Sequence, residues 1–195
     1  MKLKVNEWFY SIQGEGGRSG EASIFIRLAG CNLRCDFCDT DFGLKATLDA
    51  TELYDRIREY PCKWIVWTGG EPMLQLTDDI LLFFINKGYK QAVESNGCFP
   101  ISPLFDYTVC SPKGKPDYAR SINPEVTEVR LPVKQGDLIP DIKRLPKAFF
   151  YFLSPVFDDT DDCQTKKNID YCTAEIKKRP EWRLSLQIHK LIGIR

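Results

Sequence analysis

Three cysteines lie close together in a loop that begins with a glycine. Cys31, Cys35 and Cys38 are separated by three residues and then by two, and Gly30 directly precedes the first of them. Thiolates in one short loop can converge on a single soft metal centre. Three cysteine ligands leave one iron of a four-iron cluster without a protein ligand. The spacing therefore predicts a [4Fe–4S] cluster with one open position, where a small molecule can bind.

Two other uses of these cysteines remain open. A structural zinc site needs a fourth ligand, and the next cysteine, Cys62, lies beyond a predicted helix. Cys35 and Cys38 alone have the spacing of a thioredoxin-like redox pair, but that pair leaves Cys31 without a role. We favour the iron–sulfur cluster because it uses all three thiols and needs no fourth protein ligand.

The composition narrows the class of protein. The chain has 195 residues, enough for one domain with a sizeable core, and we expect a single domain over residues 1–195. Its formal net charge is zero, which argues against a main role in coating nucleic acid or an anionic membrane. No apolar run reaches eighteen residues and the N-terminus lacks the apolar core of a signal peptide. We therefore expect a soluble, cytoplasmic protein that binds neither nucleic acid nor membrane.

The other cysteines do not form a disulfide scaffold in this interpretation. The sequence has eight cysteines, but it is long for a disulfide-stabilised module and carries no export signal. Cys62, Cys98, Cys110 and Cys172 lie in or beside predicted strands and helices, so we expect small buried apolar residues there. Cys163 lies in the acidic-then-basic stretch 158–167, which we expect to be a solvated loop.

The elements that must position the cysteine loop alternate between strand and helix. Compact apolar runs predict strands, and capping residues and apolar periodicity predict helices. The predicted strands cover 22–28, 63–68, 91–94, 106–110, 125–131, 148–153 and 183–188, and the predicted helices cover about 49–60, 77–87 and 165–179. This order predicts right-handed βαβ units and a parallel sheet. The connections 98–105 and 114–125 are too short and proline-rich for full helices, so we expect an α/β fold that is a partial, trimmed barrel.

Polar or glycine-rich clusters follow most of these strands, at the edge where parallel sheets bind ligands. Before the first of them, residues 8–18 place three glycines around Gln13 and Glu15, which suits close backbone approach to a flat ligand. Arg27 interrupts an apolar strand just before the cysteine loop, as either a surface charge or a carboxylate clamp. His189, the only histidine, is predicted at the end of the last strand, where a substrate contact and a structural role are both open.

These motifs together resemble the radical S-adenosylmethionine (SAM) enzymes. The resemblance rests on the cysteine spacing with Phe37 before the third cysteine, and on the stretches Gly69–Pro72, Glu94–Gly97 and Ser111–Lys113. It implies the radical SAM type of partial barrel, with SAM chelated on the open iron. Reduction by a flavodoxin or ferredoxin would then yield a 5′-deoxyadenosyl radical. It also suggests a homodimer.

Four stretches narrow the resemblance within that superfamily: Ser11–Gly16, the strand segment 26–28, Cys38–Thr40 and Gln187–Lys190. They resemble the members that contract 6-carboxy-5,6,7,8-tetrahydropterin to 7-carboxy-7-deazaguanine, the base used for queuosine and related compounds. The implied reaction removes a hydrogen atom from C6 of the pterin, rearranges the ring, returns the hydrogen and releases ammonia.

The resemblance also implies roles for individual residues. The cluster would be held by Cys31, Cys35 and Cys38, and a Mg²⁺ ion that also binds the substrate carboxylate by Thr40. The residues implied at SAM are Phe37, Asp39, Gly69, Gly70, Glu71, Gly97, Ser111, Pro112, Lys113 and Ser154. Those implied at the pterin are Ile12, Gln13, Gly14, Glu15, Arg27, Ser95, His189 and Arg195. The chain departs from its relatives at Ser154–Pro155, where many have glutamine and proline, which puts the adenosine contact of the shorter side chain in question.

Two rival functions remain at this point. A radical SAM activase, which installs a glycyl radical on a partner protein, shares the cysteine spacing and the short length. It would lack the Gln13–Glu15 loop and the His189–Lys190 end. A non-catalytic zinc module would be colourless and redox-inert, whereas a four-iron cluster is brown and oxygen-sensitive.

Overall fold

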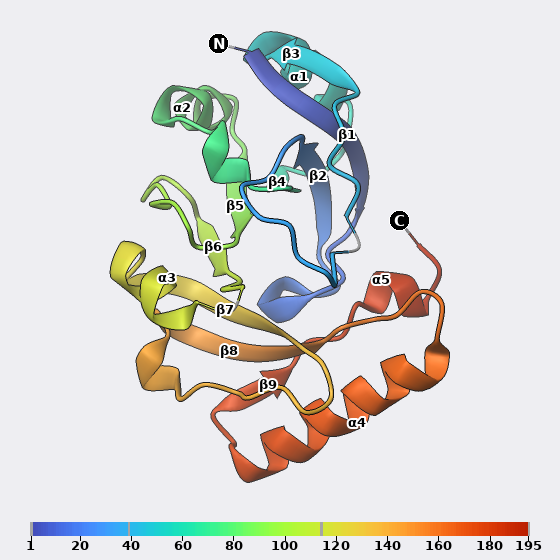
Figure 1. Ribbon diagram of the computed structural model, residues 1–195. Helices are drawn as coiled ribbons and strands as arrows, with labels where there is room; N and C mark the ends of the chain where they lie inside the picture. The colour runs from blue at the N-terminus through green and yellow to red at the C-terminus, as the bar shows by residue number, and fades with distance from the viewer. Residues whose placement is uncertain (1, 39, 114, 195) are drawn as a thin grey trace.

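One open sheet organises the molecule. The computed structural model describes residues 2–38, 40–113 and 115–194 (Figure 1). The strands are β1 (Lys2–Ile12), β2 (Ala22–Leu28), β3 (Ala46–Asp49), β4 (Trp64–Gly69), β5 (Lys90–Ser95), β6 (Tyr107–Cys110), β7 (Glu125–Val133), β8 (Lys147–Pro155) and β9 (Trp182–Leu184). The helices are α1 (Ala50–Ile57), α2 (Asp78–Asn86), α3 (Pro116–Ile122), α4 (Asp162–Lys178) and α5 (Ile188–Leu191), with short 3₁₀ turns η1 (Gly16–Arg18), η2 (Pro72–Leu74) and η3 (Ile142–Arg144).

The sheet confirms the partial barrel and corrects its N-terminal edge. The strands lie in the order β3-β1-β2-β4-β5-β6-β7-β8-β9, so the sheet ends at β3 and β9 without closing. The run from β2 to β9 is parallel, as the alternation of strands and helices predicted. β1 instead pairs antiparallel with both β2 and β3. Two strands that the sequence analysis did not predict, β3 and β1, therefore precede the parallel part in space, and the sheet as a whole is mixed.

Two element boundaries also differ from the prediction. Residues 8–12, expected in a glycine-rich loop, belong to β1, because the aromatic and branched side chains of this run pair with β2. α4 begins at Asp162 rather than near residue 165, because the Asp161 side chain accepts a hydrogen bond from the Gln164 amide and caps the helix. Part of the expected loop 158–167 is thus helical.

The end of the chain differs in the same way. The last strand covers only Trp182–Leu184, and His189 lies in the short helix α5 instead of at a strand end. The connection 114–125, expected to hold no full helix, contains the seven-residue α3.

The predicted helix starts are confirmed where side chains define them. Asp49 accepts hydrogen bonds from the Thr51 and Glu52 amides, while the Glu52 carboxylate accepts one from the Asp49 amide, as a capping box requires. Thr77 occupies the N-cap position of α2. Gly88, with φ of +81°, ends that helix in the left-handed region that favours glycine.

Two apolar clusters hold the sheet to its helices. One joins β1, β2 and β4 to α1 and α2 around Trp67, and the other joins β7 and β8 to α4 around Trp182. Cys110 and Cys172 are buried in the second cluster, as predicted, whereas Cys62 and Cys98 are only partly buried and Cys163 is exposed.

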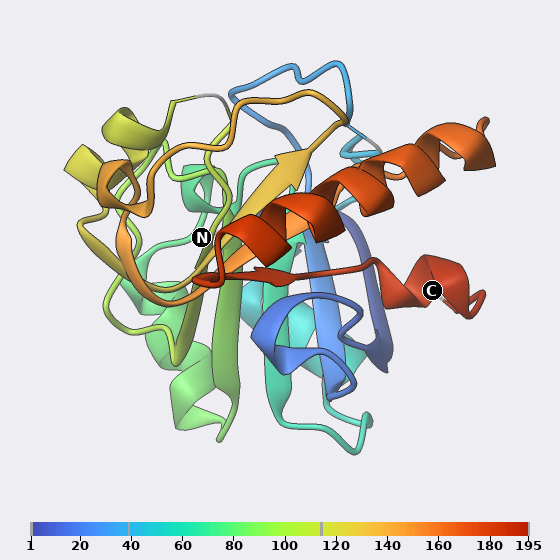
Figure 2. The same cartoon turned by 90° about the horizontal axis from the view of Figure 1, so that it is seen from below.

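The segment after β1 crosses from one end of the sheet to the other. Figures 1 and 2 both show the η1 turn beside β7 and β9 rather than beside β3. The Gly17 amide donates to Glu128 on β7, and the Gly16 amide donates to Ser185 just after β9, each at 2.9 Å. The Ile188 amide donates to the Gly14 carbonyl at 3.0 Å. This segment therefore bridges the open side of the barrel.

Candidate active site

Two adjoining cavities open at the carboxyl ends of the strands. The larger, of about 600 Å³, is lined by the cysteine loop, and the smaller, of about 380 Å³, by the end of β1 and by α5. Both cavities are lined by Glu15, Thr40, Thr68, Glu94 and Gln187, which form the border between them. Two reacting molecules could thus meet across a polar border.

The cysteine loop supplies sulfur donors to the larger cavity. Cys31, Cys35 and Cys38 all line it, and the Cys38 amide donates to the Cys35 carbonyl at 3.2 Å. Burial raises the pKa of the Cys35 thiol, the Lys113 ammonium opposes that rise, and the neighbouring Cys38 and Cys31 add to it. Within residues 2–38, 40–113 and 115–194, no three cysteine, histidine, aspartate or glutamate side chains are arranged so that they could bind one metal ion. The donor set nevertheless fits a [4Fe–4S] cluster, since three thiols share one cavity wall.

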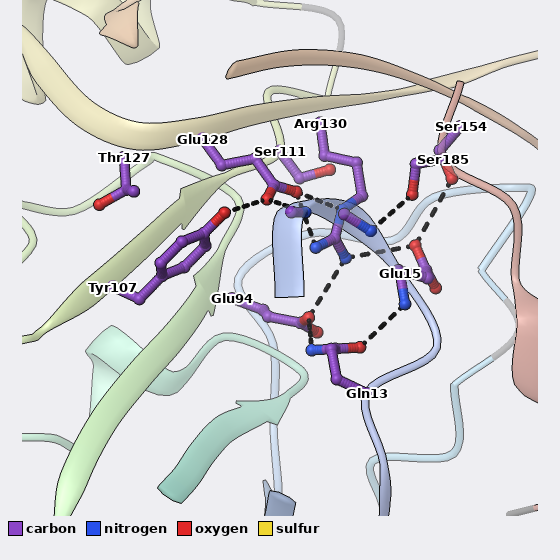
Figure 3. Close-up of polar contacts among 12 residues, drawn as sticks. Gln13, Glu15, Glu94, Tyr107, Ser111, Thr127, Glu128, Arg130, Ser154 and Ser185 are labelled. Carbon is purple, nitrogen blue, oxygen red and sulfur yellow. Dashed lines mark hydrogen bonds and ion pairs between the residues drawn. The ribbon is translucent and has the colours of Figure 1, made fainter. Parts of the chain in front are cut away.

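A buried arginine joins the border residues. Arg130 on β7 lies within 3.2 Å of the Glu15 carboxylate, 3.2 Å of the Glu94 carboxylate and 2.8 Å of the Glu128 carboxylate (Figure 3). Gln13 connects two members of this group, because its amide donates to Glu94 at 3.1 Å and accepts from the Glu15 backbone at 3.1 Å. Gln187 and Ser154 also donate to Glu15, at 3.1 and 3.5 Å.

The arginine keeps an acidic side chain ionised at the border. Burial alone would raise the pKa of Glu94, but the Arg130 guanidinium lowers it, with hydrogen bonds from Arg130, Gln13 and Thr68. The net effect is a pKa below the usual range for glutamate. Glu94 is therefore a carboxylate at neutral pH and presents only hydrogen-bond acceptors to a ligand.

Comparison with known proteins identifies the family of the chain. The Radical SAM superfamily model matches residues 25–137. The 7-carboxy-7-deazaguanine synthases of Bordetella pertussis and Bacteroides thetaiotaomicron are each 36% identical to this chain. Each alignment covers the full length of this chain and of the relative. The chain belongs to the 7-carboxy-7-deazaguanine synthase family of radical SAM enzymes.

The fold of this family is present over almost the whole chain. The crystal structure of QueE from Escherichia coli superposes with a TM-score of 0.75 and covers 97% of this chain and 95% of its own, at 23% sequence identity. As a radical SAM enzyme, the chain uses a [4Fe–4S] cluster and SAM.

The larger cavity is lined by most of the residues that the sequence analysis assigned to SAM. They are Phe37, Gly69, Gly70, Ser111, Lys113 and Ser154. Gly97, Pro112 and Glu71 line neither of the two cavities in the described part of the chain. Asp39 lies outside the described residues.

Most residues assigned to the pterin line the smaller cavity of the synthase. They are Ile12, Gln13, Gly14, Glu15, Arg27 and His189. Ser95 lies in the larger cavity instead, almost fully buried, and Arg195 lies outside the described residues. Arg27 is already paired with Glu7, Nε to Oε1, at 2.9 Å, and its side chain remains partly exposed.

Gly14 allows α5 to approach the segment between β1 and β2, residues 13–21, which we call the entry loop. A Cβ atom at this position would stand 2.2 Å from Nδ1 of His189 and 3.0 Å from its backbone nitrogen. The absence of a side chain at Gly14 thus lets His189 reach the smaller cavity, although the histidine comes from a helix and not from a strand end as predicted.

Sequence reasoning missed the residues that hold the border together. Arg130, Glu128, Tyr107, Thr68 and Gln187 were not assigned to the site. One signal was available, since Glu128 and Arg130 are two apart in the strand predicted over 125–131 and must share a face of it. Two opposite charges two residues apart on one face of a predicted strand indicate an ion pair.

Glu71 has a supporting position in the synthase. Its side chain is fully buried and accepts hydrogen bonds from the Asn96 amide (2.7 Å), the Ser95 hydroxyl (2.9 Å) and the Met73 amide (3.0 Å). Burial raises its pKa, and these three donors oppose that rise. The carboxylate thus ties the turn after β4 to the end of β5.

Replacing Glu71 with glutamine tests this supporting position. The amide would turn one N–H₂ group toward a buried donor, so we expect the free energy of unfolding to fall by about 2 kcal/mol. The matched change Glu125→Gln, at an exposed ion pair with Lys147, should alter stability by less than about 0.5 kcal/mol. Urea denaturation of both variants measures the difference, and equal stabilities would contradict the assignment.

Proposed function

We propose that the chain catalyses the radical contraction of 6-carboxy-5,6,7,8-tetrahydropterin to 7-carboxy-7-deazaguanine, with loss of ammonia, in deazapurine (queuosine) biosynthesis. The observation that carries this proposal is the pair of cavities. One is lined by three cysteine thiols, the other by groups suited to a polar heterocycle with a carboxylate, and both share one border. The full-length similarity to curated synthases of this name supports the same substrate. It also favours this reaction over a glycyl-radical activase or a zinc module.

The larger cavity would hold the cofactors. Cys31, Cys35 and Cys38 would bind the cluster, and Gly69, Gly70, Phe37, Ser111, Lys113 and Ser154 would border SAM. Once held by these residues, the reduced cluster and SAM would supply the 5′-deoxyadenosyl radical that takes the hydrogen atom from C6 of the pterin. Lys113 donates to Ser111 at 2.9 Å, lies near the Phe37 ring and interacts electrostatically with Cys35. Its positive charge would face the carboxylate of bound SAM.

The smaller cavity would orient the pterin. Arg27 offers guanidinium donors to the substrate carboxylate, while Gln13, Glu15 and Glu94 offer an amide and two carboxylates to the ring edge. His189 would close the cavity from α5. Because the two cavities share their border residues, a pterin in the smaller cavity would lie next to SAM in the larger one.

Thr40 is the proposed oxygen ligand of Mg²⁺. It lines both cavities, so an ion on its hydroxyl would stand where the substrate carboxylate meets the cysteine loop. Mg²⁺ prefers oxygen ligands and takes few of them from protein, which suits one threonine plus a substrate carboxylate. The ion would orient that carboxylate and offset charge that develops during the rearrangement.

Three further properties belong to the same proposal. A flavodoxin or ferredoxin would supply the electron, and the protein would act in the cytoplasm as a homodimer. Exposed apolar side chains at the end of β1 and on α5 support an interface between two copies: Tyr10, Ile12, Ile188, Leu191 and Ile192. Among the described residues, no helix has the length and apolar character needed to cross a membrane.

Anaerobic turnover tests the proposed function. Reconstituted protein is mixed with SAM, Mg²⁺, dithionite and the carboxytetrahydropterin, and the products are read by mass spectrometry. We expect 7-carboxy-7-deazaguanine, in smaller yield when Mg²⁺ is omitted. SAM cleavage without the deazaguanine would show radical chemistry on another substrate. Colourless protein that does neither would refute the proposal.

A further inference from the structure

The deepest charge cluster of the site lies around Arg130. Its four side chains are Arg130, Glu15, Glu94 and Glu128, and they come from the segment after β1, from β5 and from β7 (Figure 3). The Arg130 and Glu128 side chains are 8% and 0% exposed, whereas those of Glu15 and Glu94 are 17% and 25% exposed. The cluster therefore has a buried half and a half that faces the cavities.

Each of the three guanidinium nitrogens of Arg130 already contacts a carboxylate. Nη1 donates to Glu15 and to Glu94, each at 3.2 Å, while Nε and Nη2 lie 2.8 Å from Glu128. A substrate carboxylate would have to displace one of these partners. Arg130 consequently acts through the two glutamates at the border and not as a carboxylate clamp of its own.

Glu128 fixes the direction of the guanidinium. Its carboxylate also accepts from the Tyr107 hydroxyl at 2.7 Å and from the Gly17 amide at 2.9 Å, so it is held from β6 and from the η1 turn. Gly16 leaves room for this contact, because a Cβ there would stand 2.2 Å from Oε1 of Glu128 and 2.5 Å from Nη2 of Arg130. The anchor is thus built into the glycines of the entry loop.

The charges of the cluster do not balance. Three carboxylates face one guanidinium, and Lys113 is a further cation that interacts electrostatically with Glu15. An excess of acceptors at the border suits a ligand edge rich in N–H donors. The pyrimidinone ring of a pterin has such an edge, formed by its 2-amino group and N3–H.

We propose that Arg130 is a positioning residue, which holds the carboxylates of Glu15 and Glu94 at a fixed spacing where they receive the N–H donors of the pterin ring. The inference rests on the proposed function for the identity of the ligand. The role of Arg130 itself rests on the contacts of the cluster. Lysine cannot replace it, because one ammonium lacks the planar fork that reaches three carboxylates at once.

The test compares Arg130→Lys with Arg144→Lys, the same change in the exposed pair between Arg144 and Asp117. Both holoenzymes should match the wild type in iron content. We expect Arg130→Lys to lower kcat/KM for the carboxytetrahydropterin roughly tenfold to a hundredfold, mostly through KM. It should also cleave more SAM for each product formed. Arg144→Lys should behave as the wild type. Normal KM and normal coupling in Arg130→Lys would overturn the proposal.

The pH profile separates positioning from a loss of folding. The charged groups around Glu94 are Arg130, Glu15 and Glu128, and only Arg130 holds the pKa of Glu94 down by its charge. Weakening that contact lets the pKa of Glu94 rise, so the acid limb of kcat/KM should move to higher pH in Arg130→Lys. An unmoved acid limb would count against the proposal.

Two further measurements keep the inference testable. If Arg130→Lys does not fold, Tyr107→Phe is the alternative variant, because it removes only one hydrogen bond from Glu128. This change should raise KM about threefold. An unchanged KM would overturn the role of Glu128 in fixing the Arg130 guanidinium. Should the wild type not convert the pterin, the proposed function fails. The crystal structure of Arg130→Lys then decides the role of Arg130, with displaced Glu15 and Glu94 carboxylates expected and unmoved ones contradicting it.

Discussion

Replacing Cys35 with alanine is expected to reduce SAM cleavage below detection. Cys35 is the middle cysteine of the loop, and its thiol interacts electrostatically with both other thiols and with Lys113. Two remaining cysteines cannot hold a four-iron cluster that has three protein ligands, so the variant should lose its brown colour and its iron. Without the cluster, no electron reaches SAM and no 5′-deoxyadenosine forms.

The control for this prediction is Cys163→Ala. Cys163 is exposed on α4 and lines neither cavity, so its removal should leave iron content, colour and SAM cleavage unchanged. Anaerobic iron analysis and chromatography of 5′-deoxyadenosine measure both variants. A Cys35→Ala protein that keeps its iron and cleaves SAM would show that the three cysteines do not form the cluster site.

Replacing Gly70 with alanine should prevent the cysteine loop from docking. A Cβ atom at this position would stand 1.9 Å from the Gly30 carbonyl oxygen and 2.9 Å from Cβ of Cys31. The obstacle is backbone, so no side-chain rotation relieves it. The same carbonyl accepts from the Glu71 amide at 3.0 Å, and that hydrogen bond must lengthen or break. We expect the free energy of unfolding to fall by about 3 kcal/mol, with a lower iron content after reconstitution.

Gly43→Ala is the matched control, since this exposed glycine lies just after the cysteine loop. Its added Cβ would approach only the flexible Asp41 side chain, at 3.2 Å, so stability should change by less than about 1 kcal/mol. Denaturation curves and iron analysis of the two variants separate a general cost of alanine from the clash at Gly70. A Gly70→Ala protein as stable and as rich in iron as the control would disprove the contact.

Local sequence determined several features of the site. The cysteine spacing, the turn Gly69–Pro72 and the segment Gln13–Glu15 could be assigned directly, because adjacent residues stay adjacent in the fold. Apolar runs with polar ends also predicted which edge of the sheet carries the site, since the carboxyl ends of parallel strands meet there. The capping box at Asp49 and Glu52 is equally local and is confirmed.

The sequence was less informative where a segment makes its backbone hydrogen bonds with residues that are far away in the sequence. β1 was not predicted, and its last residues, 8–12, were expected in a loop, because antiparallel pairing with β2 and β3 leaves no helix between strands as a signal. His189 was placed at a strand end, but α5 forms where the Ile188 amide finds the Gly14 carbonyl. Side-chain and backbone contacts over more than 170 positions decided that ending.

The chain alone thus determined the cofactor class and the edge of the sheet that carries the site, since these depend on residue types at short spacing. Only the tertiary structure decided how the border is built. Glu15, Glu94 and Arg130 are separated by dozens of residues, and each of them looks like an ordinary charge in its own segment. Their meeting depends on the η1 turn crossing the open barrel to β7. A buried guanidinium with three carboxylates is stable only in that arrangement, because burial without partners would cost several kcal/mol.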